Sequence, residues 1–116
     1  GHARRFAYLV SPKYDVADAA ALPDGSLVVV ERRFRLPFRF SNRIMLVPAA
    51  QITPGRVARG RLIAELDSPL IHDNFEGVAV TQEGEATILW LVSDDNQLFL
   101  QKSYLLKFRL DRAAIR

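Results

Sequence analysis

The stretch 73–108 constrains the fold more than any other part of the chain, because apolar runs alternate in it with dense polar clusters. Two apolar runs, 78–80 and 86–92, are separated by a short turn segment that ends in glycine, and this pattern is typical of an antiparallel β-hairpin. An antiparallel hairpin returns the chain to the edge it left. We therefore expect the polar clusters 73–77 and 93–96 at the same end of one hairpin.

Composition narrows the class of protein. The 116 residues suit a single domain, and the chain is 49% hydrophobic and 25% charged, as in ordinary globular proteins. The net charge of +3 is too small to predict nucleic-acid binding, and no apolar run approaches the roughly 20 residues that cross a bilayer, so we expect neither nucleic acid nor membrane as a partner. The chain has no cysteine, which excludes disulfides and thiol chemistry. The opening residues 1–3 resemble the remnant of a tag.

The remaining apolar runs also favour strands over helices. The alanine-rich segment 16–22 is compatible with a helix, but the turn signal Pro23-Asp24-Gly25 and the β-branched run after it favour a second hairpin. The strands that we predict are 6–10, 16–22, 26–34, 40–47, 58–66, 75–80, 86–93 and 104–110.

The two hairpins form a weak internal repeat. Each has an acidic residue, a strand of small side chains and a turn with an acid beside glycine, and Gly25 and Gly84 lie 59 positions apart. Roughly 40–50 residues is usual for a four-stranded propeller blade. The sequence thus predicts an all-β fold whose antiparallel sheets form about two units of a β-propeller-like fold, unit one at about 16–67 and unit two at about 73–110.

In a propeller blade, the entry of the innermost strand and the exit of the second strand share one rim. The acidic and basic residues at these points should therefore gather there. We expect Asp18, Arg32 and Arg33 of unit one beside Glu76, Asp94 and Asp95 of unit two. A closed ring needs about 4–8 blades, so two units predict either self-association or the remainder of a longer propeller chain as a partner.

Several motifs resemble the bacterial family called "esterase-like activity of phytase". They are the segments 74–80 (NFEGVAV) and 89–96 (LWLVSDDN), followed by Gln101 and 105–108 (LLKF), and, upstream, 21–32 (ALPDGSLVVVER). The resemblance extends over most of residues 6–110. It implies a β-propeller-like fold in a longer, often exported chain, of which this would be the C-terminal portion, and a periplasmic or secreted location. It also implies phosphoester hydrolysis.

The acidic rim offers only oxygen ligands. Glu76, Asp94 and Asp95, with Asn74 and Asn96, provide the carboxylate and amide oxygens that Ca²⁺ prefers. Because several carboxylates on one rim repel one another, a bound cation would stabilise them. We therefore expect a Ca²⁺ site at these five residues, with the three carboxylates also acting in catalysis.

Basic residues near the rim complete the predicted site. Arg32 and Arg33 could bind a phosphate through paired hydrogen bonds, and Lys102 is a third candidate for binding the substrate. The expected substrate is a phosphorylated small molecule. The expected reaction is attack on phosphorus by a metal-activated water.

A second interpretation is non-enzymatic. Asp and Asn at strand ends most often form turns and cap backbone amides, and an Arg-Arg pair is often a solvated strand end. On that interpretation the chain is a non-catalytic ligand-binding or protein-interaction β-propeller module. The sequence leaves the two alternatives open.

Overall fold

A computed structural model describes residues 6–35, 39–68, 75–95 and 102–111, and for some strand residues it describes the backbone alone. The described part consists of strands, short connections and one 3₁₀ turn, η1 (Ala49–Gln51). The strands are β1 (Ala7–Leu9), β2 (Asp15–Ala21), β3 (Leu27–Arg35), β4 (Arg39–Val47), β5 (Val57–Arg59), β6 (Arg61–Ser68), β7 (Phe75–Glu83), β8 (Ala86–Asp95) and β9 (Lys102–Leu110). Within these residues, no helix is long and apolar enough to cross a membrane.

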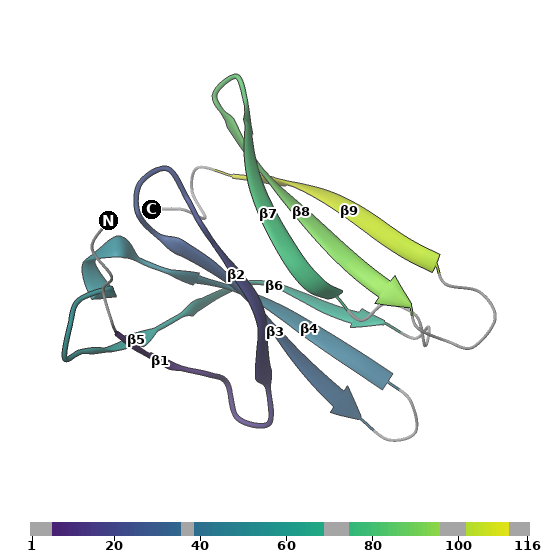
Figure 1. Ribbon diagram of the computed structural model, residues 1–116, viewed down its shortest axis with the longest axis horizontal. Helices are drawn as coiled ribbons and strands as arrows, with labels where there is room; N and C mark the ends of the chain where they lie inside the picture. The colour runs from purple at the N-terminus through teal and green to yellow at the C-terminus, as the bar shows by residue number, and fades with distance from the viewer. Residues whose placement is uncertain (1–5, 36–38, 69–74, 96–101, 112–116) are drawn as a thin grey trace.

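Two antiparallel sheets make up most of the fold (Figure 1). The four-stranded sheet has the order β2-β3-β4-β6, and the three-stranded sheet has the order β7-β8-β9. A small parallel pair, β1 with β5, lies beside the four-stranded sheet. The predicted all-β fold with antiparallel sheets is confirmed, including a strand rather than a helix in the alanine-rich segment.

The two hairpins turn with different loops. In the first, the backbone N–H of Leu22 donates to the carbonyl of Ser26, and Gly25 adopts φ +90° inside this five-residue loop. In the second, β7 and β8 pair up to the two-residue turn Gly84-Glu85, where Gly84 has φ +60°. Glycine is favoured at both positions because a side chain there would clash with the backbone.

Both hairpins also carry a bulge near their open end. In β2 the extra residue is Ala17, because the pairing shifts between Val16 and Asp18. In β7 the extra residue is Glu76, because Phe75 pairs with Ser93 while the next residue to pair is Gly77. The two bulged residues lie 59 positions apart, as the two turn glycines do. The repeat seen in the sequence therefore has a structural counterpart in β2 and β7.

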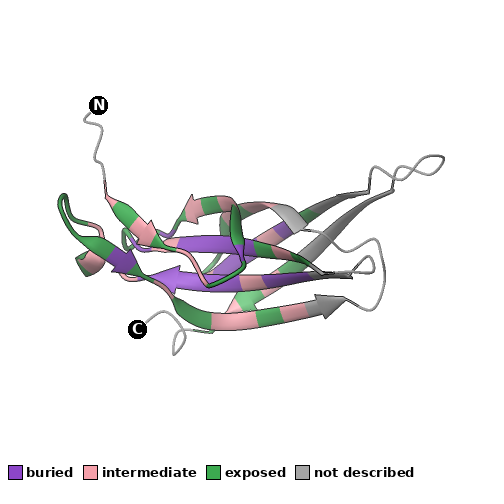
Figure 2. Ribbon diagram, turned by 90° about the horizontal axis from the view of Figure 1, so that it is seen from below, coloured by how far each residue is buried: buried purple, intermediate pink, exposed green. Residues whose placement is uncertain are grey.

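The main core lies between the two sheets. Alternate residues of β3, β4 and β8 point into it, and a band of buried residues runs through the middle of the molecule (Figure 2). The buried members are Leu22, Val28, Val30, Ile44, Leu46, Leu89 and Leu91. Burial of these aliphatic side chains is what holds one sheet against the other.

The other face of the four-stranded sheet has its own smaller core. Val29, Met45 and Val47 point away from the three-stranded sheet and pack with Ala58 of β5. Phe6 and Tyr8 of the N-terminal segment pack against this cluster. The β1–β5 pair thus covers the face of the sheet that the second sheet leaves open.

The predicted strand 58–66 is two strands. β5 ends at Arg59 and pairs with β1, whereas β6 begins at Arg61 and pairs with β4. Gly60 separates them, and a Cβ at this position would lie 2.9 Å from the Cβ of Met45. Only glycine allows this close approach, so the chain changes sheets at a residue that the alternating pattern does not distinguish.

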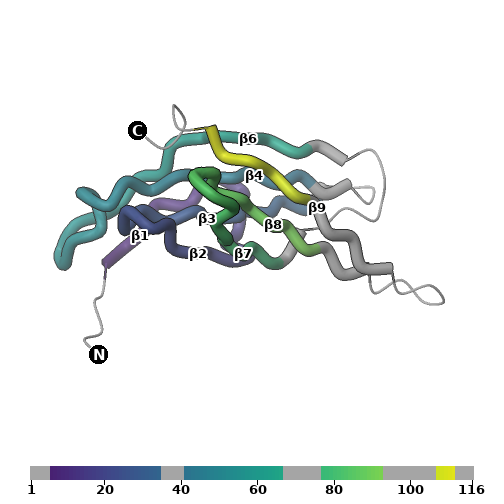
Figure 3. Tube along the Cα trace, turned by 90° about the horizontal axis from the view of Figure 1, so that it is seen from above, coloured from purple at the N-terminus to yellow at the C-terminus, as the bar shows by residue number. Residues whose placement is uncertain are grey.

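The first strands of the two hairpins, β2 and β7, run side by side. β7 contacts β2 and β3, and Figures 1 and 3 show β7 next to β2, with both hairpin turns at the same end of the molecule. The open ends of the two hairpins consequently lie at the other end. Neighbouring blades of a propeller would lie in this way, and the propeller-like fold itself stays a prediction.

Candidate functional site

The acidic residues of the second hairpin meet at one end of the three-stranded sheet. The bulged Glu76 lies between the pairs Phe75–Ser93 and Gly77–Val92. Asp95, two residues after Ser93 in β8, pairs with Lys102 at the start of β9. The strand register thus brings the backbone of four predicted site residues to the same end: Glu76, Asp94, Asp95 and Lys102. The side chains of these four residues lie outside the described part, as do Asn74 and Asn96 entirely.

The arginine pair occupies the corresponding end of the four-stranded sheet. Arg32 pairs with Asp15 at the entry of β2, and Arg33 pairs with Ser41 of β4. Arg32 is exposed and Arg33 is partly exposed. Because β2 and β7 run side by side in the same direction, the exits of β3 and β8 point to the same end of the molecule.

A buried carboxylate stands directly beside this arginine pair. Glu31 is completely buried. Its Oε2 accepts hydrogen bonds from the Tyr8 hydroxyl at 2.5 Å and from the Ser11 backbone N–H at 3.3 Å. Its Oε1 is buried and has no hydrogen-bond partner among the described residues.

The backbone of the same residue is held from the opposite face of the sheet. The side-chain amide of the fully buried Asn42 donates to the carbonyl of Glu31 at 3.2 Å. Contacts on both faces therefore fix β3 at the residue just before Arg32 and Arg33. In the sequence Glu31 is followed by Arg32 and Arg33, a pattern typical of a solvent-exposed strand end. The sequence therefore does not predict that Glu31 is buried.

The Tyr8 hydroxyl should make stability depend on alkaline pH. Burial, the hydrogen bond to Glu31 and its negative charge raise the pKa of Tyr8 above its ordinary value of about 10. The Tyr8 hydroxyl therefore stabilises the folded protein fully below pH about 10, where the phenol is neutral in both the folded and the unfolded state. As pH rises further this stabilisation is lost, because the phenol of the unfolded chain ionises at a lower pH than that of the folded protein. We expect Tyr8→Phe to lower the free energy of unfolding at pH 8 by about 1–3 kcal/mol.

Urea unfolding of both proteins at several pH values between 8 and 11 measures this effect. The wild-type protein should lose stability more steeply than Tyr8→Phe above pH about 10, so that the two curves converge. The Phe variant is a close control because it keeps the ring that packs against Val29 and Met45. If the free energies of unfolding of the two proteins change in parallel from pH 8 to 11, the Tyr8 hydroxyl does not donate a hydrogen bond to Glu31.

The metal prediction rests on donor chemistry. The strand register places the backbone of Glu76, Asp94 and Asp95 at one end of the three-stranded sheet. Carboxylates offer only oxygen ligands, and an all-oxygen donor set would fit Ca²⁺. Among the side chains that the structure describes, no group of three or more His, Cys, Asp or Glu residues is placed to hold a metal ion. In the strand register Lys102 pairs with Asp95, so a cationic residue lies opposite an acidic one on the neighbouring strand.

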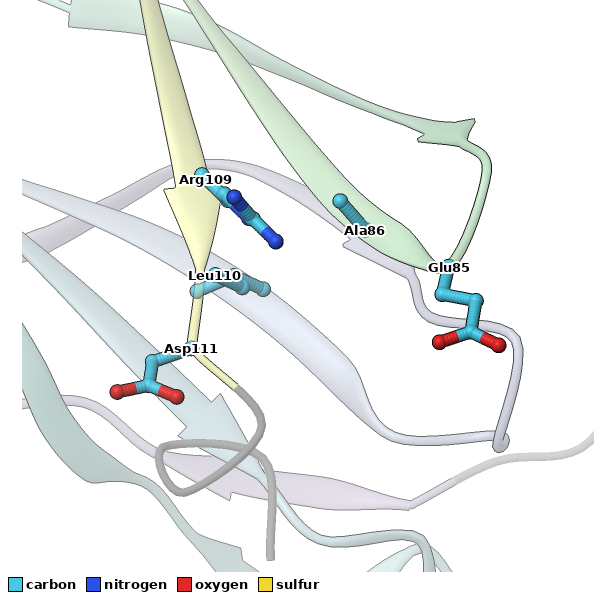
Figure 4. Close-up of a pocket in the computed structure, with 5 residues that line it drawn as sticks. All are labelled: Glu85, Ala86, Arg109, Leu110 and Asp111. Atoms are coloured by element: carbon cyan, nitrogen blue, oxygen red, sulfur yellow. The ribbon is translucent and has the colours of Figure 1, made fainter.

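A pocket in the described part lies far from this end. It has a volume of about 560 Å³ and is lined by Glu85, Ala86, Arg109, Leu110 and Asp111. Figure 4 shows these residues at the turn of the β7–β8 hairpin and at the end of β9. That is the end of the three-stranded sheet opposite to Glu76 and Asp95. The pocket therefore does not belong to the predicted rim.

Comparison with known proteins identifies the family. Searches of the curated proteins and of the solved structures found no match. The sequence model of the Phytase-like family, described as "esterase-like activity of phytase", matches residues 2–97. This range is more than half of the chain and includes both hairpins, the arginine pair and the carboxylates Glu76, Asp94 and Asp95. The chain therefore belongs to the Phytase-like family.

Proposed function

We propose that this chain forms part of a phosphoester-hydrolysing site at the open ends of its two hairpins. The observation that carries the proposal is the meeting of Glu76, Asp94 and Asp95 at one end of a sheet, in a chain of the Phytase-like family. The arginine pair of the neighbouring sheet supports it, because guanidinium groups bind phosphate oxygens in pairs. The proposed substrate is a phosphorylated small molecule.

In the proposed site, Glu76, Asp94 and Asp95 would hold Ca²⁺. The ion would lower the pKa of a bound water and neutralise charge on the phosphoryl group. Asn74 and Asn96, which lie outside the described residues, would supply further oxygen ligands.

The protein's own residues would orient the substrate. Arg32, Arg33 and Lys102 would bind the non-bridging oxygens of the phosphate and hold the phosphorus facing the water. A carboxylate of the rim would accept the proton of the attacking water. A bond would form between phosphorus and the water oxygen while the bond to the alcohol oxygen breaks. The leaving alkoxide would take up the proton that the carboxylate accepted from the water.

Two further proposals concern the cellular location of the protein and the assembly of its sheets. Family membership supports a periplasmic or secreted location, in which free Ca²⁺ is plentiful enough for a weak site. We also propose that the two sheets are neighbouring blades of a propeller-like ring. Because a ring needs about 4–8 blades, the rest would come from other copies of the chain or from a longer chain.

Thermal unfolding with and without Ca²⁺ tests the site directly. A ligand that binds only the folded state stabilises it by mass action, by about 1.4 kcal/mol when free Ca²⁺ is tenfold above its Kd. We expect millimolar Ca²⁺ to raise the Tm by several degrees and Mg²⁺ at the same concentration to raise it less. Hydrolysis of a chromogenic phosphate monoester should depend on Ca²⁺ over the same range.

The same measurements separate the alternatives. Stabilisation by Ca²⁺ without hydrolysis would favour a non-catalytic binding module. A Tm indifferent to Ca²⁺, together with no hydrolysis, would reject the proposed site.

A further inference from the structure

Asp18 joins β2 and β7, the adjacent edge strands of the two sheets. Its Oδ2 accepts a hydrogen bond from the backbone N–H of Val78 at 2.9 Å, across 60 positions of sequence. Its Oδ1 accepts one from the backbone N–H of Ala19 at 2.8 Å, which fixes the orientation of the carboxylate. Hydrogen bonds to an ionised acceptor are roughly twice as strong as those between neutral groups.

This contact lies at the bulges of both strands. Asp18 directly follows the bulged Ala17 of β2, and Val78 lies two residues after the bulged Glu76 of β7. β7 is the edge strand of its sheet, so N–H groups on its outer side have no strand partner. Asp18 satisfies such a group at the place where regular pairing with β8 begins.

A contact from outside the sheet helps to fix the conformation of a bulge. The extra residue of a bulge takes no part in the strand ladder. In β7 it is followed by Gly77, whose missing side chain leaves the backbone more freedom. The bond from Val78 to Asp18 limits that freedom from the neighbouring sheet.

We propose that Asp18 is a positioning residue for Glu76. By holding the Val78 N–H it fixes the bulge of β7, and it thereby sets the direction in which Glu76 leaves the backbone at the rim. The inference rests on the proposed function, because Glu76 is there a ligand of Ca²⁺. The orientation of Glu76 on the three-stranded sheet would thus depend on Asp18 of the four-stranded sheet.

Asp18→Ala and Asp24→Ala form a matched pair for the test. Asp24 lies in the same hairpin and also accepts two hydrogen bonds, from the backbone N–H of Ser26 at 2.9 Å and from its hydroxyl at 3.1 Å, but at the turn end. Calorimetric titration with Ca²⁺ at a temperature where both variants are folded gives the affinities. We expect Asp18→Ala to weaken Ca²⁺ binding at least about tenfold, as the loss of a residue that orients a metal ligand does, and Asp24→Ala to leave it within about twofold.

Amide hydrogen exchange gives a second readout without metal. In Asp18→Ala the Val78 amide should exchange severalfold faster than in the wild-type protein, whereas in Asp24→Ala it should be unchanged. Should Asp18→Ala fail to fold, Asp18→Asn replaces it. The amide side chain keeps the shape and one acceptor oxygen but cannot accept both N–H groups, so it should weaken Ca²⁺ binding by a smaller factor.

The outcomes separate this inference from the proposed function. If the wild-type protein takes up no Ca²⁺, the site is rejected and the positioning role with it. If the wild-type protein binds Ca²⁺ and Asp18→Ala binds it equally well, only the positioning role is rejected. Equal weakening in Asp18→Ala and Asp24→Ala would also overturn it, because the effect would then be one of general stability.

Discussion

Leu91→Ala should lower the free energy of unfolding by about 2–5 kcal/mol, the range for large-to-small substitutions in a packed core. Leu91 is completely buried and lies in the core between the two sheets, near the middle of β8. The loss has two parts, the apolar area returned to water on unfolding and the cavity left in the folded state. Because domains of this size are stabilised by only about 5–15 kcal/mol, this one substitution would remove a large share.

Val92→Ala is the matched control for this prediction. Val92 follows Leu91 in β8 and points to the opposite face of the sheet, where it is 40% exposed. Its truncation should cost less than about 1 kcal/mol. Urea unfolding followed by tryptophan fluorescence of Trp90 measures both variants. Equal losses would mean that the two sheets do not pack through this face of β8.

Glu76→Gln combined with Asp94→Asn should abolish Ca²⁺ binding and reduce hydrolysis at least about 100-fold, because it neutralises two of three proposed carboxylate ligands. Both replacements keep the size of the side chain, so the sheet should remain intact. Less repulsion between the acids should leave the metal-free protein as stable as the wild type or slightly more stable. Calorimetric titration and a phosphate-monoester assay over a range of Ca²⁺ concentrations measure the two effects.

Glu85→Gln with Asp111→Asn is the control for that pair. It removes the same two charges from exposed residues at the opposite end of the same sheet, beside the pocket of Figure 4. Affinity for Ca²⁺ and the rate of hydrolysis should stay near their wild-type values. If both double variants weaken binding alike, the attraction comes from the net charge of the chain, and the rim holds no specific site.

Local pattern was sufficient to predict the strands. The run, turn and run of 78–92 predicts β7 and β8 because the alternation and the glycine turn act between near neighbours. The same argument favoured a strand at β2, although its alanines would also suit a helix, since the turn and the β-branched strand after it offer a pairing partner. It failed at Gly60, where a close approach to Met45, distant in the sequence, divides one predicted strand into two.

Strand pairing alone predicts only which residues of the candidate site lie at the same end of one hairpin. That Glu76 and Asp94 meet at one end follows from an antiparallel hairpin and needs no tertiary information. Arg32 and Arg33 required the further idea that the two hairpins are repeats placed side by side. The roles of these side chains, of Lys102 and of Ca²⁺ stay predictions, to be decided by the experiments described above.

The sequence by itself determined the β class, both hairpins and the end of each at which charged residues gather, because these depend on side chains that are neighbours along the chain or across one turn. Only the tertiary structure decided that Glu31 is buried beneath Tyr8 and that Asp18 holds Val78 of the other sheet. Both contacts join positions more than 20 residues apart. Their energy depends on which faces pack together and on how far water is excluded, and neither quantity can be read from a local pattern.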